Sequence, residues 1–208
     1  MIVREFMTSE VVTVTPNDNI ADTMALMREK KINRLPVIEN GQVVGIVTDG
    51  DLREVSPSPA STLSIFELNY LVAKTTIREI AIKKVISCRT DSNIEDAAIL
   101  MRDNHIGGLP VVDDGKLMGI ITQTDIFDAF LEIMGFRIPS QRFVIETKDK
   151  VGLISDLATT ILDYNVNIAS FAGYHLADQR IQILVRLNGE RVAEVIEFLS
   201  KKGYEIKK

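Results

Sequence analysis

The chain contains an internal repeat, and this repeat constrains its fold more than any other feature of the sequence. Residues 2–56 align with residues 76–130 without a gap, and roughly a third of the aligned positions are identical. The clearest match lies between GIVTDGDL at 45–52 and GIITQTDI at 119–126. A unit of about 55 residues is small for a hydrophobic core of its own. The two copies are therefore expected to pack as a pair.

Each copy is expected to fold as strand, helix, strand, strand, helix. In the first copy, EVVTVTP at 10–16 is rich in β-branched residues and is typical of a strand that ends at Pro16. Asn17 is expected to cap the helix that follows, in which hydrophobic residues recur at helical spacing. ENGQ at 39–42 and DDGK at 113–116 predict the turn of a β-hairpin in each copy.

The repeated Thr-x-x-Asp has two interpretations. Thr48 is expected at the N-cap of the last helix, where free backbone N–H groups and the positive end of the helix dipole suit a phosphate group. Asp51, one turn later, offers acceptor oxygens for the paired hydroxyls of a ribose. Alternatively, the threonine only caps the helix and the aspartate only balances its dipole. Capping alone would accept Ser, Asp or Asn, so the same pair at Thr122 and Asp125 favours a ligand.

Composition disfavours several classes of function. The formal net charge is −5 and the basic residues do not cluster, which argues against binding to nucleic acid. Two histidines and one cysteine are few for a metal site built from soft ligands. Cys88 lies in an apparent strand and is expected to be a buried structural residue. No apolar run approaches the ~18 residues of a membrane span, so we expect a cytoplasmic protein without a membrane partner.

The two copies resemble a pair of CBS domains, also called a Bateman module. The resemblance rests on INRLPVIENGQVVGIVTDGDL and IGGLPVVDDGKLMGIITQTDI and covers residues 1–130. It implies that each aspartate binds a ribose, that each threonine lies near phosphates, and that the residues before each proline line the adenine and phosphate site. One cleft is then expected to contain Ile32, Asn33, Arg34, Thr48, Gly50 and Asp51. The other is expected to contain Ile106, Gly107, Gly108, Thr122, Thr124 and Asp125, and Thr13 and Ser87 are expected to border the bases.

The copies differ at one position of this implied site. The first copy has Arg34, a cation that can bind a phosphate through two hydrogen bonds, and the second copy has Gly108 at the matching position. Unequal sites are therefore expected. The sequence leaves open whether Arg34 serves the cleft of its own copy or reaches across the pseudo-twofold axis to the other one. It also leaves open whether His105 lies near a ligand or is a surface residue at a helix end.

The segment between the copies begins with Ser-Pro-Ser-Pro, which breaks regular structure. Hydrophobic residues at helical spacing then predict a linker helix within 57–75. Two roles stay open for this helix: a connector that packs on its own module, or a contact in a dimer.

Residues 140–208 predict the order β-α-β-β-α-β of a ferredoxin-like domain. The segment KDKVGLISDLATTILDYNVNI resembles an ACT domain, although Val151 replaces the proline that usually precedes the glycine. The resemblance implies either dimerisation or binding of an amino acid. His175 and Tyr174 are expected to be strand surface residues and not ligands. Candidate ligand residues carried over from the ACT family are Asp149, Gly152, Asn165 and Asn167.

The predicted architecture is α+β: CBS domain 1 at 1–56, the linker helix at 57–75, CBS domain 2 at 76–135 and an ACT domain at 140–208. This arrangement resembles the acetoin-utilisation B-type proteins. It implies a homodimeric regulator that binds AMP, ADP, ATP or S-adenosylmethionine and acts on an unknown partner protein. No cofactor is expected, and no nucleophile, general base or metal carboxylates converge as an enzyme would require. The alternatives are a scaffold that binds nothing and an amino-acid sensor.

Overall fold

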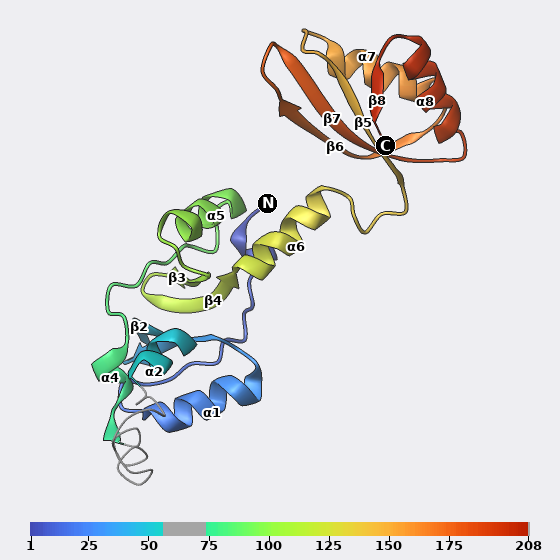
Figure 1. Cartoon of the computed structure of the whole chain (residues 1–208). Coiled ribbons are helices and arrows are strands. Elements are labelled where there is room, and N and C mark those ends of the chain that lie inside the picture. The colour runs from blue at the N-terminus through green and yellow to red at the C-terminus, as the bar shows by residue number, and fades with distance from the viewer. Residues whose placement is uncertain (56–73, 208) are drawn as a thin grey trace, which may run out of the picture. The chain divides into compact units, whose positions relative to one another are not determined.

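The computed structural model describes residues 1–55 and 74–207, and these form two compact units, Met1–Ile126 and Phe127–Lys208 (Figure 1). The linker helix expected at 57–75 lies outside the described residues except for its last two positions. In the part of the chain that is described, no helix is long and apolar enough to cross a membrane.

The first copy contains a helix, a hairpin and a second short helix. The segment 10–16 is not the strand that its composition predicts, because only Val14 pairs, in parallel with Val37. The cap of the first helix is also shifted from the predicted Asn17 to Asn19, whose side chain accepts a hydrogen bond from the Asp22 N–H. The elements are α1 (Ile20–Lys30), β1 (Arg34–Glu39), β2 (Gln42–Thr48) and α2 (Asp49–Val55).

The second copy repeats this arrangement, as the sequence predicts. Cys88 pairs with Val111 as Val14 pairs with Val37. The two hairpins have the same register: Arg34 lies opposite Thr48, and Gly108 lies opposite Thr122. The elements are α5 (Ile94–Asp103), β3 (Gly108–Asp113), β4 (Lys116–Thr122) and α6 (Gln123–Ile133).

The two copies exchange short segments, which the repeat boundaries did not predict. The N-terminal turn η1 (Val3–Glu5) belongs by sequence to the first copy, but the Val3 N–H donates to the Ser92 carbonyl at 2.9 Å, and Thr8 pairs with Ile120. In turn α4 (Ile77–Ile80) contributes Ile77 to the hydrophobic core of the first copy. Each copy is therefore completed by a segment from the start of the other copy.

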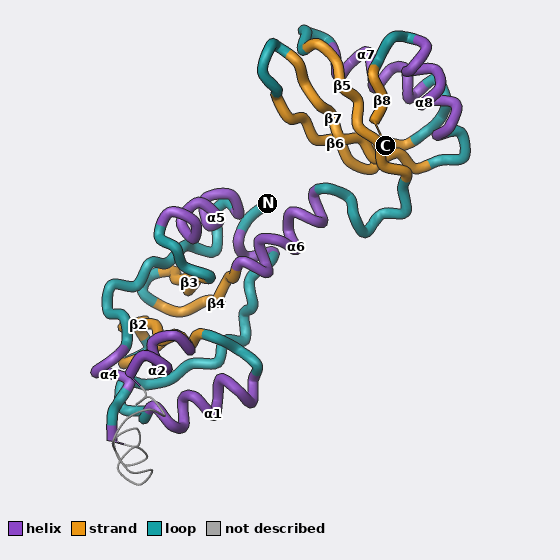
Figure 2. The backbone as a smooth tube through the Cα atoms, viewed as in Figure 1, coloured by secondary structure: helices purple, strands orange, loops and turns teal. Residues whose placement is uncertain are grey.

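The second unit has the predicted β-α-β-β-α-β order. Its strands form one antiparallel sheet in the order β6-β7-β5-β8. Two helices lie on one face of this sheet (Figure 2). Leu153, Leu157, Val195 and Leu199 from these helices pack with Ile183 of the sheet in one buried core. The elements are β5 (Gln141–Lys148), α7 (Leu153–Leu162), β6 (Asn167–His175), β7 (Arg180–Asn188), α8 (Val192–Lys201) and β8 (Glu205–Lys207).

Candidate functional site

The repeated threonine and aspartate form a cap at the start of α2 and of α6. Thr48 donates to Asp51 Oδ2 from its backbone N–H at 2.8 Å and from Oγ1 at 2.7 Å. Thr122 makes the same two bonds to Asp125 Oδ2, both at 2.7 Å. The capping interpretation is therefore confirmed in both copies. Each cap uses only one oxygen of its carboxylate, so capping does not prevent the aspartate from binding a ligand through Oδ1.

A second matched pair of hydrogen bonds fixes the loop before each hairpin. The Asp49 N–H donates to the Asn33 carbonyl at 3.0 Å, and the Gln123 N–H donates to the Gly107 carbonyl at 3.2 Å. These bonds use N–H groups of the first helical turn, which have no partner inside the helix. They hold the residues before each hairpin beside the helix that follows it.

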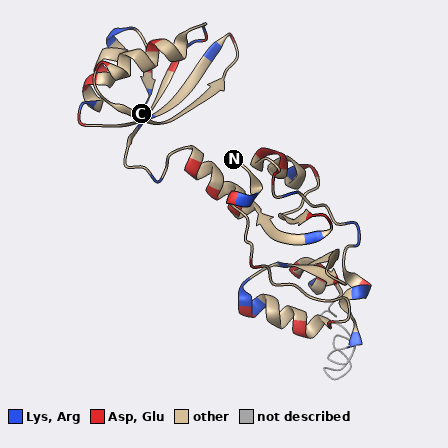
Figure 3. Cartoon of the chain, turned by 180° about the vertical axis from the view of Figure 1, so that it is seen from behind, with Lys and Arg blue, Asp and Glu red and all other residues tan. Residues whose placement is uncertain are grey.

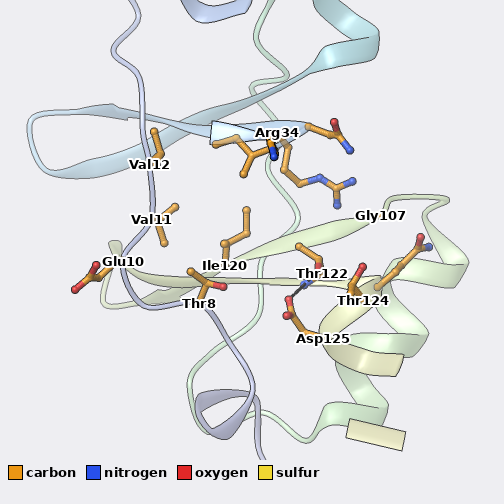
Figure 4. Close-up of a pocket in the computed structure, with 14 residues that line it drawn as sticks. Thr8, Glu10, Val11, Val12, Arg34, Gly107, Ile120, Thr122, Thr124 and Asp125 are labelled. Carbon is orange, nitrogen blue, oxygen red and sulfur yellow. Dashed lines mark hydrogen bonds between the residues drawn. The ribbon is translucent and has the colours of Figure 1, made fainter. Parts of the chain in front are cut away.

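The first of two clefts in the CBS pair has a volume of about 520 Å³. Arg34 extends toward Gly107 and the Thr122–Asp125 turn, and Val11, Val12 and Ile120 line the apolar side (Figure 4). Its lining combines residues of both copies. From the first copy and its N-terminal segment come Thr8, Glu10, Val11, Val12, Lys31, Ile32, Asn33 and Arg34, and from the second come Gly107, Ile120, Thr122, Gln123, Thr124 and Asp125.

The second cleft has a volume of about 530 Å³, and its helix start comes from the first copy instead of the second. It joins the start of α2 to the loop before β3. His105, whose position the sequence left open, lines this cleft and also lies in the turn just after α5, with a positive φ of 54°. The lining residues are Asn33, Arg34, Ile46, Thr48, Asp49, Gly50, Ile82, Lys84, Ile86, His105, Ile106, Gly107 and Gly108.

The structure groups the candidate residues differently from the sequence-based prediction. Most residues expected in one cleft do line one cleft together: Asn33, Arg34, Thr48 and Gly50 line the second, and Gly107, Thr122, Thr124 and Asp125 line the first. The prediction missed that the other copy completes each cleft, because β2 packs against β4 and the loop before one hairpin faces the helix start of the other copy. Of the described candidates, Thr13, Asp51 and Ser87 line neither cleft, whereas Val12, Gly50 and Ile86 beside them do. Periodicity within one copy could not reveal this exchange.

Arg34 lines both clefts, which resolves the alternative that the sequence left open. Its Nη1 atom is buried without a hydrogen-bond partner among the described residues. A Cβ atom on Gly107 would lie 2.6 Å from Arg34 Nη2, and one on Gly108 would lie closer still to Nη1. The two glycines therefore make room for the guanidinium. Burial lowers the pKa of Arg34, but an arginine stays charged at neutral pH.

The remaining charges differ between the clefts. Lys31, Glu10 and Asp125 line the first cleft, and Lys84 and Asp49 line the second, where Asp49 also pairs with Arg53. Acidic and basic residues are interspersed over both units (Figure 3).

The structure shows how the potential metal ligands and the single cysteine are placed. Among residues 1–55 and 74–207, no three His, Cys, Asp or Glu side chains are placed to hold a metal ion. Cys88 is buried, and burial raises the pKa of its thiol to about 11, so it is protonated at neutral pH and a poor nucleophile.

The second unit has a smaller cleft of about 390 Å³ beside the start of α7. Asp149 and Gly152 line it, whereas Asn165 and Asn167 are not among its described lining residues. Asn165 instead has a positive φ of 54° in the turn after α7.

His175 is an exposed residue of β6, as predicted, and it also lines this smaller cleft. Its Nδ1 atom lies 3.5 Å from Asp149 Oδ2. The alternation of strand side chains was the available signal, because Phe171, Gly173 and His175 face the same side of β6 and all line the cleft.

Comparison with known proteins assigns the part of the chain that forms these clefts to a family. The CBS domain model matches residues 3–58 and 77–132. The crystal structure of CBSX2 from Arabidopsis thaliana in complex with AMP has a TM-score of 0.53 and 34% identity, and the match covers 64% of this chain and 97% of that one. The CBS domain pair of protein MJ0100, in complex with 5′-methylthioadenosine and S-adenosyl-L-methionine, has a TM-score of 0.52 and 30% identity over 62% and 95% of the two chains.

A third related structure is that of a protein assigned to acetoin utilization (AcuB) from Vibrio cholerae. It has a TM-score of 0.55 and 26% identity, and the match covers 68% of this chain and 98% of that one. The family model spans more than half of the sequence in two segments that coincide with the internal repeat. The chain belongs to the CBS domain family and carries a tandem CBS pair.

Proposed function

We propose that this protein is a regulatory sensor whose CBS pair binds an adenine nucleotide or S-adenosylmethionine. The observation that carries the proposal is the first cleft, where a capped aspartate, a half-buried arginine and an apolar wall converge. Related CBS pairs bind AMP, S-adenosyl-L-methionine and 5′-methylthioadenosine, which supports an adenosine-containing ligand. A volume of about 520 Å³ suits a small ligand.

Each part of such a ligand has a candidate partner in the first cleft. We expect Asp125 to accept from the ribose hydroxyls through Oδ1, because only its Oδ2 is used by the cap. Arg34 and Lys31 supply positive charge for a phosphate or a carboxylate. Val12 and Ile120 offer apolar surface to the adenine ring.

The repeat offers a matched pair of variants for the test. Asp125→Ala and Asp51→Ala delete equivalent caps, so each is expected to lower stability by about 1 kcal/mol. Only Asp125 lines a described cleft. Thermal unfolding is measured for wild type and both variants with AMP, ADP, ATP and S-adenosylmethionine. Ligand at ~100 times its dissociation constant adds about 2.7 kcal/mol. We expect Asp51→Ala to keep the full shift and Asp125→Ala to lose the part of the shift that the first cleft contributes.

Two results would contradict this assignment. An unchanged ligand shift in Asp125→Ala would remove that residue from the site. Absence of any shift in wild type would favour the alternative of a scaffold without a ligand. Release of phosphate from ATP, lost on the same substitution, would instead indicate an enzyme.

We further propose that the second unit is a ferredoxin-like ACT domain and that the protein is a cytoplasmic homodimer. The strand order β6-β7-β5-β8 supports the domain assignment. The domain divisions 1–56, 57–75, 76–135 and 140–208 are part of this proposal. An amino acid at Asp149 and Gly152 is a second candidate ligand, supported by the cleft at the start of α7. The same thermal assay with amino acids tests it.

A further inference from the structure

We propose that Arg34 is a shared anion-binding residue that couples the two clefts negatively, so that a phosphate bound in one cleft weakens phosphate binding in the other. This inference rests on the proposed function, because it assumes that both clefts accept an adenosine ligand. It adds a regulatory property that equal, independent sites would lack.

The two clefts share part of their lining. Asn33, Arg34 and Gly107 line both clefts, and Arg34 is the only one of these three that carries a charge. Lys31 lines the first cleft and Lys84 lines the second. Each cleft therefore has a cation of its own in addition to the shared guanidinium.

The guanidinium of Arg34 is not fully hydrogen-bonded. Buried polar groups in proteins are usually hydrogen-bonded, and a buried charge without a partner is costly. Arg34 Nη1 has no partner among the described residues. A phosphate entering from either cleft would satisfy it, and a guanidinium binds phosphate most strongly through two parallel hydrogen bonds.

The two copies differ at this position, because Gly108 of the second copy matches Arg34 of the first. An arginine at position 108 would have to share the space that Arg34 occupies, because even a Cβ atom there meets Arg34 Nη1. The pair therefore has one guanidinium for two clefts. If only one phosphate can bind this guanidinium at a time, the two ligands compete for it. If both phosphates bind it at the same time, they lie close together and repel each other. The coupling is therefore negative in both cases.

Site-resolved titration tests this proposal on the full chain. Isoleucine methyl NMR reports the first cleft through Ile120 and the second through Ile86. AMP and adenosine are titrated separately, because they differ only in the phosphate. Arg34→Gln is expected to raise the dissociation constant of AMP at both reporters by 5-fold or more, on the order of typical coupling effects, and to leave that of adenosine unchanged. A merely structural role of Arg34 would affect adenosine as well.

Coupling is then measured by disabling one cleft at a time. Asp125→Ala disables the first cleft, and Lys84→Glu weakens phosphate binding in the second. In wild type, one cleft is expected to fill at a higher AMP concentration than the other. When the other cleft is disabled, the AMP concentration that half-fills this cleft is expected to fall by roughly 5-fold or more. With adenosine, or in the Arg34→Gln background, the gain is expected to vanish.

The inference is overturned if Arg34→Gln weakens AMP at only one reporter, or if disabling one cleft leaves AMP binding in the other unchanged. Failure of the proposed function is distinguishable, since wild type would then bind neither AMP nor adenosine.

Discussion

At the scale of single residues, a cap and a ligand site are not alternatives in this fold. Asp125 uses Oδ2 for the two bonds from Thr122, and it still lines the first cleft. Asp51 makes the equivalent cap without lining a described cleft. Equal residues in a repeat therefore have equal structural roles here but different positions relative to the clefts.

Tyr204 in the second unit gives a residue-scale prediction. Its hydroxyl donates to Asp156, and burial together with this bond raises its pKa to about 12 from 10.0. Because the folded pKa is raised, the stabilisation is complete below pH 10 and is lost as pH rises toward 12. Tyr204→Phe is expected to lower the free energy of unfolding at pH 8, and the difference from wild type is expected to shrink above pH 10. Urea unfolding across this range measures it.

Tyr174→Phe is the control for this prediction, because the Tyr174 side chain is exposed. It should change stability little at any pH. A difference between wild type and Tyr204→Phe that stays constant up to pH 12 would rule out the raised pKa.

At the scale of elements, the exchanged segments hold the CBS pair together. Ile77 of α4 is fully buried in the first copy's core, although it belongs to the second copy in sequence. Ile77→Ala is expected to lower the stability of the first unit by about 2–5 kcal/mol, as for other buried large-to-small changes. Chemical denaturation followed by circular dichroism measures the change. Ile82→Ala, whose side chain is 45% exposed, should cost far less. Equal costs would show that α4 is not part of the core.

The sheet of the second unit gives a prediction on acid stability. Glu146 of β5 accepts from Lys207 of β8 and Gln182 of β7, and pairs with Arg180. These bonds, Lys207 first, hold the pKa of the Glu146 carboxyl below its usual value of 4.5. The stabilisation is therefore present above pH 4.5 and is lost as pH falls through the lower, folded pKa.

Replacing Glu146 with glutamine tests this network. Glu146→Gln is expected to lower the free energy of unfolding at pH 7 and to make it less dependent on pH below 4.5, as measured by urea unfolding at both conditions. Glu205→Gln, at a side chain that is 54% exposed, serves as the control. A variant that loses stability as steeply in acid as wild type would argue against the role of Glu146.

At the scale of the whole molecule, the chain is expected to be a homodimer. Light scattering should give twice the 23.2 kDa of one chain. The second unit has a hydrophobic core of its own, so the fragment 139–208 is expected to unfold cooperatively when expressed alone. A monomer mass for the full chain would contradict the dimer, and a fragment without a cooperative transition would contradict independent folding.

The sequence by itself determined the repeat, the hairpins, the Thr–Asp caps and the element order of the second unit, because these depend on contacts between near neighbours in the chain. It did not predict that 10–16 pairs only through Val14, since β propensity does not supply a partner strand. Only the tertiary structure decided that Ile77 completes the other copy's core, that each cleft combines both copies, and that Arg34 faces both. Those outcomes depend on how two similar surfaces pack, which no single copy encodes.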